Sequence, residues 1–257
     1  MNTPVQTARY VKLPFSLDQG VAARAAIGLV VLATDHTIEH EWRKLLALDG
    51  VAFFESRVFN SADISPETLA EMEGRIADGV ALIRPGERID VVAFGCTSAS
   101  MVIGEERVFE RIREVRPRAA CTTPITAARV AFNALGVTRI GLLTPYVREI
   151  NESMAAYLGA RGIDVVAMGS FEHANDNEVA RIDEDSLRHA VEAVGNQPDV
   201  EAVFVSCTSL RIAEAVAQIE STLGKPVTSS NHAMAWHALR LAGIDDVLPD
   251  LGRLFTV

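Results

Sequence analysis

Two cysteines in this chain of 257 residues each follow a short apolar segment and precede two hydroxyl residues. A thiol can exchange a proton with carbon or add to carbon, and adjacent hydroxyl and backbone N–H groups can hold a carboxylate. The motif occurs once in each half of the chain, which suggests one site built from two related parts. The two motifs are Gly95-Cys96-Thr97-Ser98 and Ser206-Cys207-Thr208-Ser209.

The apolar segments before the two motifs, residues 91–94 and 202–205, are too short for helices and rich in Val and Phe. They are typical of buried parallel strands, whose carboxyl ends are where open α/β sheets bind ligands. A helix beginning directly after each cysteine would favour the thiolate, so we predict a lowered pKa for both thiols. The alternative is that both cysteines are core residues and that the hydroxyl residues only cap helices, but the recurrence of the motif favours a function.

Further correspondences predict a duplicated fold. The strand around Gly28 matches the strand around Gly141, and residues 121–123 correspond to residues 227–230. Strands are expected at 27–33, 51–58, 91–94, 119–121, 140–143, 164–169, 202–205 and 226–229. Helices are expected at 37–47, 65–83, 105–115, 125–135, 147–158, 185–194, 212–223 and 232–241.

This alternation of strands and helices predicts an α/β protein made of two pseudo-symmetric, flavodoxin-like half-domains with parallel sheets. Residues 1–25 would form an N-terminal extension, residues 26–136 the first half-domain, and residues 137–257 the second. The active site would lie in the cleft between the halves, with Cys96 and Cys207 opposite each other.

Composition excludes several classes of function. A net charge of −10 argues against a nucleic-acid partner, and there is no apolar run of about 18 residues for a membrane span. Three cysteines cannot all pair, which indicates a reducing, cytoplasmic location. The segment from His36 to His40 fits the H-x-x-E-H pattern of inverted zinc peptidases, but no third ligand is evident, so we expect no metal.

The two cysteine motifs, together with Thr144-Pro145-Tyr146, resemble the aspartate/glutamate racemase superfamily, in particular its maleate cis-trans isomerase and arylmalonate decarboxylase branch. The resemblance extends over about residues 26–243. It implies cofactor-independent chemistry next to a carboxylate. In racemases of the superfamily one cysteine removes a proton and the other returns one, whereas in maleate isomerases the first cysteine adds to the double bond.

The resemblance also implies roles for individual residues. Cys96 and Cys207 would be catalytic, and Tyr146 would hydrogen-bond a substrate carboxylate. Asn177 is similar to a family asparagine that lines the cleft. Decarboxylase members lack the first cysteine, so Cys96 favours an isomerase or racemase. The remaining candidates for substrate binding are Thr97, Ser98, Thr208 and Ser209.

Asp35 departs from the maleate isomerase pattern, which has an asparagine there. An ionised aspartate would repel a dicarboxylate, but it could pair with a substrate ammonium or tune Cys96. Thr34-Asp35 together with the Gly-Cys-Thr-Ser motif also looks similar to members associated with ectoine breakdown. We therefore expect an isomerase or racemase of a small carboxylate that forms a homo-oligomer; an arylmalonate-type decarboxylase and a non-catalytic two-lobed binding protein are the alternatives.

Overall fold

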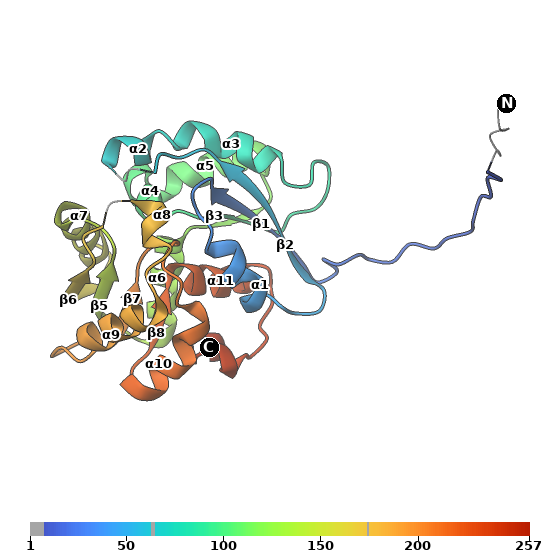
Figure 1. Ribbon diagram of the computed structural model, residues 1–257. Coiled ribbons are helices and arrows are strands. Elements are labelled where there is room, and N and C mark those ends of the chain that lie inside the picture. Colours follow the sequence, from blue (N-terminus) through green and yellow to red (C-terminus); the bar gives the residue numbers. More distant parts are fainter. Residues whose placement is uncertain (1–7, 63–64, 174) are drawn as a thin grey trace, which may run out of the picture.

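Two four-stranded parallel sheets form the frame of the protein in the computed structural model, which describes residues 8–62, 65–173 and 175–257 (Figure 1). The strand orders are β2-β1-β3-β4 and β6-β5-β7-β8, so the second sheet repeats the topology of the first. This confirms the predicted pair of related α/β half-domains. The strands are β1 (Ala25–Leu32), β2 (Val51–Val58), β3 (Val91–Phe94), β4 (Ala120–Thr122), β5 (Arg139–Thr144), β6 (Asp164–Ser170), β7 (Ala202–Val205) and β8 (Val227–Ser229).

Helices connect the strands and cover both faces of the sheets (Figure 1). All eight residues of β1 are buried, as are all four residues of both β3 and β7, because helices lie on both sides. The helices are α1 (Ile38–Leu45), α2 (Pro66–Ala70), α3 (Glu73–Ala81), α4 (Thr97–Ile103), α5 (Glu105–Val115), α6 (Pro124–Leu135), α7 (Arg148–Gly159), α8 (Asp176–Val179), α9 (Glu184–Gly195), α10 (Val216–Leu223) and α11 (Ser230–Leu241).

The predicted helix at residues 65–83 is divided into two. Ser65 caps α2 as expected and accepts a hydrogen bond from Thr68 N, but the helix ends after five residues and α3 begins at Glu73. The break lets Leu69, on α2, and Ile76, on α3, both pack into the core of the first half. Two short helices, α4 and α8, were not predicted as separate elements, and a 3-10 turn at Ala213–Ala215 precedes α10.

The last helix of each half lies between the two sheets. Phe132 of α6, which follows the first sheet in the chain, packs edge-on against Phe204 of the second sheet with ring centroids 6.0 Å apart. Met234 and Leu239 of α11 in turn belong to the core cluster that covers the first sheet. The helices α6 and α11 also pack against each other, so the halves share their cores across the junction.

The N-terminal segment does not join either core. Residues 8–21 are exposed, and Figure 1 shows this segment leading away from the body of the protein. Within the described ranges, no helix has the length and apolar character needed to cross a membrane.

Candidate functional site

The two cysteine motifs both lie at the ends of central strands, but their local structures differ. Cys96 follows β3 and caps α4, and its Sγ accepts a hydrogen bond from Ala99 N at 3.4 Å. Cys207 follows β7 and enters a turn in which Leu210 N donates to the Cys207 carbonyl at 3.4 Å. The predicted helix start after each cysteine is therefore correct for Cys96 and wrong for Cys207.

One small cavity between the halves brings the two motifs together. Both cysteines line it, although they are 111 positions apart in the chain (207 − 96). Its volume is about 30 Å³, which is room for only a couple of water molecules, so side chains must move apart to admit anything larger. The cavity is lined by Leu32, Asn60, Ser61, Thr68, Leu69, Met72, Cys96, Thr97, Ser98, Tyr146, Asp176, Cys207 and Thr208.

Burial keeps both thiols protonated near neutral pH. It raises the pKa of Cys96 from its usual 9.0 to about 12, against the lowering effect of the Ala99 amide. Burial, followed by the negative charge of Asp176, raises the pKa of Cys207 still further. The expected lowering of the thiol pKa values is thus wrong, because the loss of water outweighs one or two backbone amides.

Tyr146 is fixed beside both thiols by hydrogen bonds to its backbone. Tyr146 N donates to Thr144 Oγ1 at 3.0 Å, and Asn151 Nδ2 donates to the Tyr146 carbonyl at 2.9 Å. Burial raises the pKa of its hydroxyl well above the usual 10.0, and the side chain lines the same cavity as Cys96 and Cys207. Tyr146 therefore presents a neutral O–H donor to the cavity at neutral pH.

Asp176 lies at the cavity where Asn177 was expected. Asn177 is exposed and is not among the lining residues, whereas Asp176 is buried and lines the cavity. The Asp176 carboxylate accepts hydrogen bonds from Ser209 Oγ at 2.7 Å and from Thr34 Oγ1. Ser209 thus holds Asp176 and does not itself line the cavity, unlike Thr97, Ser98 and Thr208.

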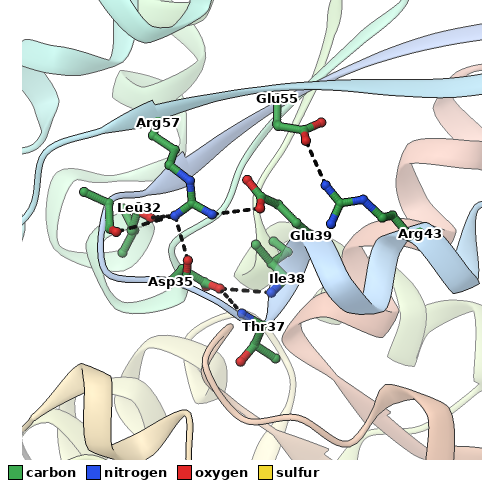
Figure 2. Close-up of polar contacts among 9 residues, drawn as sticks. Leu32, Asp35, Thr37, Ile38, Glu39, Arg43, Glu55 and Arg57 are labelled. Atoms are coloured by element: carbon green, nitrogen blue, oxygen red, sulfur yellow. Dashed lines mark hydrogen bonds and ion pairs between the residues drawn. The ribbon is translucent and has the colours of Figure 1, made fainter.

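Asp35 lies in the turn between β1 and α1, next to residues of the cavity but outside its lining. Its Oδ1 accepts hydrogen bonds from Thr37 N at 2.7 Å and Ile38 N at 2.9 Å (Figure 2). Its buried Oδ2 has no hydrogen-bond partner among the described residues. Burial raises the pKa of Asp35 to about 6. Asp35 therefore shapes the turn after β1 and is not among the residues that line the cavity.

Arg57 donates hydrogen bonds to the backbone of the same turn. It donates to the backbone carbonyl of Asp35 at 2.7 Å and pairs with the Glu39 carboxylate at 2.7 Å (Figure 2). His40, at the other end of the zinc-peptidase pattern, lies 3.2 Å from Glu214 Oε1. Glu39 and His40 of that pattern thus contact charged partners on the surface, near the start of α1.

The buried carboxylate of Glu41 also connects the two halves near the site. Glu41 of α1 accepts hydrogen bonds from Ala213 N and from Asn231 Nδ2, each at 2.7 Å. Asn231 Nδ2 also donates to the Thr208 carbonyl at 2.8 Å, which links this network to the second cysteine motif. Burial raises the pKa of Glu41 to about 7. A glutamate in an amphipathic helix is usually a surface residue, so the sequence carried no signal for this contact.

Fold and site together define a two-lobed α/β protein in which each lobe contributes one cysteine to a buried cavity. The chain matches the family profile described as arylmalonate decarboxylase over residues 27–255, and it belongs to this family. It is 36% identical over 137 residues to an arylmalonate decarboxylase from Bordetella bronchiseptica, covering 52% of this chain and 57% of that enzyme. It is 30% identical over 238 residues to a maleate isomerase from Nocardia farcinica, covering 89% of this chain and 94% of that enzyme.

Solved structures agree with this assignment. A Nocardia farcinica maleate cis-trans isomerase with one cysteine changed to serine and a covalently bound succinylcysteine intermediate has a TM-score of 0.82. It shares 28% identity and covers 90% of this chain and 98% of its own. A crystal structure of arylmalonate decarboxylase has a TM-score of 0.74 with 27% identity, over 90% and 98% of the two chains.

Proposed function

We propose that this protein is a cofactor-independent isomerase or racemase that acts on a small carboxylate through Cys96 and Cys207. The observation that carries this proposal is that both cysteines and Tyr146 line the same small cavity. The covalent succinylcysteine in the related maleate isomerase supports chemistry at a thiol. The racemase resemblance supports a role for a thiol on each side of the reacting carbon.

In the proton-transfer form of this reaction, one cysteine acts as a thiolate and accepts the proton from the carbon next to the carboxylate. The electron pair of the broken C–H bond moves into the carboxylate as an enolate, which the O–H of Tyr146 and the motif hydroxyls stabilise. The other cysteine then donates its proton to the opposite face. The first residue ends as a thiol and the second as a thiolate, so the proton balance closes.

Serine substitutions test this proposal. Cys96→Ser and Cys207→Ser should each lower turnover at least about 100-fold, because a serine hydroxyl is a far weaker acid than a thiol and does not ionise to act as a base near neutral pH. Cys121→Ser is the matched control, since Cys121 is also buried but is absent from the cavity lining. Turnover measured as solvent-deuterium incorporation separates proton transfer from thiol addition to a double bond, which leaves the α-carbon undeuterated. Full turnover in either active-site variant would refute the proposal.

A decarboxylase is the second candidate, favoured by the family profile and by the 36% identical relative. The resemblance implies that such an enzyme works with the second cysteine alone. It predicts release of carbon dioxide from a substituted malonate and unchanged release after Cys96→Gly. A non-catalytic binding protein would instead give ligand-induced thermal shifts without turnover of any carboxylate.

A further inference from the structure

The charge of the cavity lining restricts the substrate more narrowly than the two thiols do. Asp176 is the one charged residue among the described lining residues, which include no Lys, Arg or His. A substrate with two carboxylates would therefore bring two negative charges to a buried site that already holds a third. Burying like charges together without a cation is strongly unfavourable.

Asp176 is held as a hydrogen-bond acceptor. It is 5% exposed, and both of its carboxyl oxygens accept from hydroxyl groups, Oδ1 from Ser209 and Oδ2 from Thr34. Thr34 Oγ1 itself accepts from Asn60 Nδ2 at 2.8 Å, so its own proton is directed at Asp176. Two donors arranged in this way suit a carboxylate, whose remaining lone pairs are open to a donor in the cavity.

The nearby basic groups are committed elsewhere. Arg57, which lies beside the turn that carries Thr34, directs its guanidinium at the Glu39 carboxylate and at backbone carbonyls, including that of Asp35 (Figure 2). No ion pair to Asp176 occurs in the portion of the chain that the structure describes. A cation that neutralises Asp176 must therefore come from the bound molecule.

We propose that Asp176 binds a protonated amino group of the substrate, so that the substrates are small carboxylates carrying an ammonium group rather than dicarboxylates. The cationic group would occupy the side of the cavity formed by Asp176, and the carboxylate would lie among Thr97, Ser98 and Tyr146. This assignment rests on the proposed function, because it presumes that the cavity between the cysteines is where substrate binds.

The same arrangement couples substrate binding to the thiols. The negative charge of Asp176 is one of the causes that raise the pKa of Cys96 and Cys207, after burial. A bound ammonium compensates that charge and makes ionisation of a thiol less costly. A ligand that lacks the amine leaves this charge uncompensated.

Matched ligand pairs test the assignment on the protein without its catalytic thiols. The full chain carrying Cys96→Ser and Cys207→Ser is titrated by calorimetry with alanine against propionate, and with 2-aminobutyrate against butyrate. The amine of each pair should bind at least about 10-fold more tightly than the carboxylate without it, as expected for a charge-assisted hydrogen bond in a buried site. Asp176→Asn, added to that protein, should reduce the preference to about 1.

The outcomes separate the two proposals. Preference for the amine in both pairs, lost in Asp176→Asn, supports the subsite even if the unsubstituted protein shows no deuterium incorporation, a result that would refute only the proposed reaction. Equal or tighter binding of propionate and butyrate would overturn the subsite. Turnover of maleate or a malonate without turnover of any amino acid would also overturn the subsite. That result would leave the proposed thiol mechanism intact. If Asp176→Asn does not fold, the ligand pairs on the doubly substituted protein still distinguish these outcomes.

Discussion

The Ser230 hydroxyl lies 2.8 Å from Thr97 Oγ1, which connects the first residue of α11 to the first cysteine motif. The same Ser230 oxygen accepts a hydrogen bond from Cys207 N at 3.1 Å. One buried hydroxyl therefore links the chain segments that carry the two thiols. Its position follows from the packing of α11 between the halves, where it begins directly after β8.

Ser230→Ala should weaken both the fold and the site. The substitution leaves the buried Cys207 N–H without its acceptor, which costs about 1–3 kcal/mol of unfolding free energy. We expect turnover to fall as well, because the backbone of Cys207 is no longer tied to Thr97. Urea denaturation and turnover under identical conditions check this, with Ser153→Ala on the exposed face of α7 as the control. Unchanged turnover would show that the link is only structural.

Tyr146→Phe should lower turnover about 10- to 100-fold and change stability little. The ring stays in place, but the donor beside Cys207 is lost, and with it a hydrogen bond to the developing enolate. Tyr157→Phe is a matched control, because its hydroxyl contacts Glu105 at 2.9 Å away from the cavity. Equal turnover in both variants would remove Tyr146 from the mechanism.

Glu41 should make the protein less stable as the pH rises from about 4.5 to about 7. Below pH 4.5, its usual pKa, the carboxyl is protonated in both states. Between these values the unfolded chain releases the proton while the folded chain retains it, because burial raises the folded-state pKa to about 7. The accumulated loss is about 3 kcal/mol and does not grow further above pH 7.

The difference between the unsubstituted protein and Glu41→Gln isolates this effect. Chemical denaturation at a series of pH values should show a component of the pH dependence between 4.5 and 7 that the variant lacks. Subtraction removes the opposite contribution of His232 and His237, whose burial lowers the pKa of each to about 4. Glu106→Gln, on the exposed side of α5, should keep the full dependence. Parallel curves for Glu41→Gln and the unsubstituted protein would contradict the assignment.

The thiols of Cys96 and Cys207 should be unreactive in the protein without added ligand. With a pKa of about 12 instead of 9.0, Cys96 has roughly 1000-fold less thiolate at pH 8, and burial further limits access. Alkylation by iodoacetamide, followed by mass spectrometry, should be at least about 100-fold slower in the folded than in the denatured protein. Rapid alkylation of Cys96 or Cys207 at pH 8 would show that the thiols are ionised or exposed.

The sequence by itself determined the order of the main elements and the pairing of the cysteine motifs. Apolar runs such as residues 91–94 and 202–205 are too short for helices and typical of buried strands, and their alternation with amphipathic helices favours parallel sheets. The strand at residues 51–58 and the helix at residues 105–115 match β2 and α5 in their bounds. The carboxyl ends of two such sheets then place both thiols at one cavity.

The tertiary structure alone decided which neighbouring residue faces that cavity and how the thiols are charged. Asp176 rather than Asn177 lines it because the four-residue helix α8 turns one of two adjacent side chains inward. Glu41 is buried because α11 crosses to the first sheet and brings Asn231 to it. Desolvation and contacts between distant segments depend on how the halves pack, and local sequence patterns carry no record of that packing.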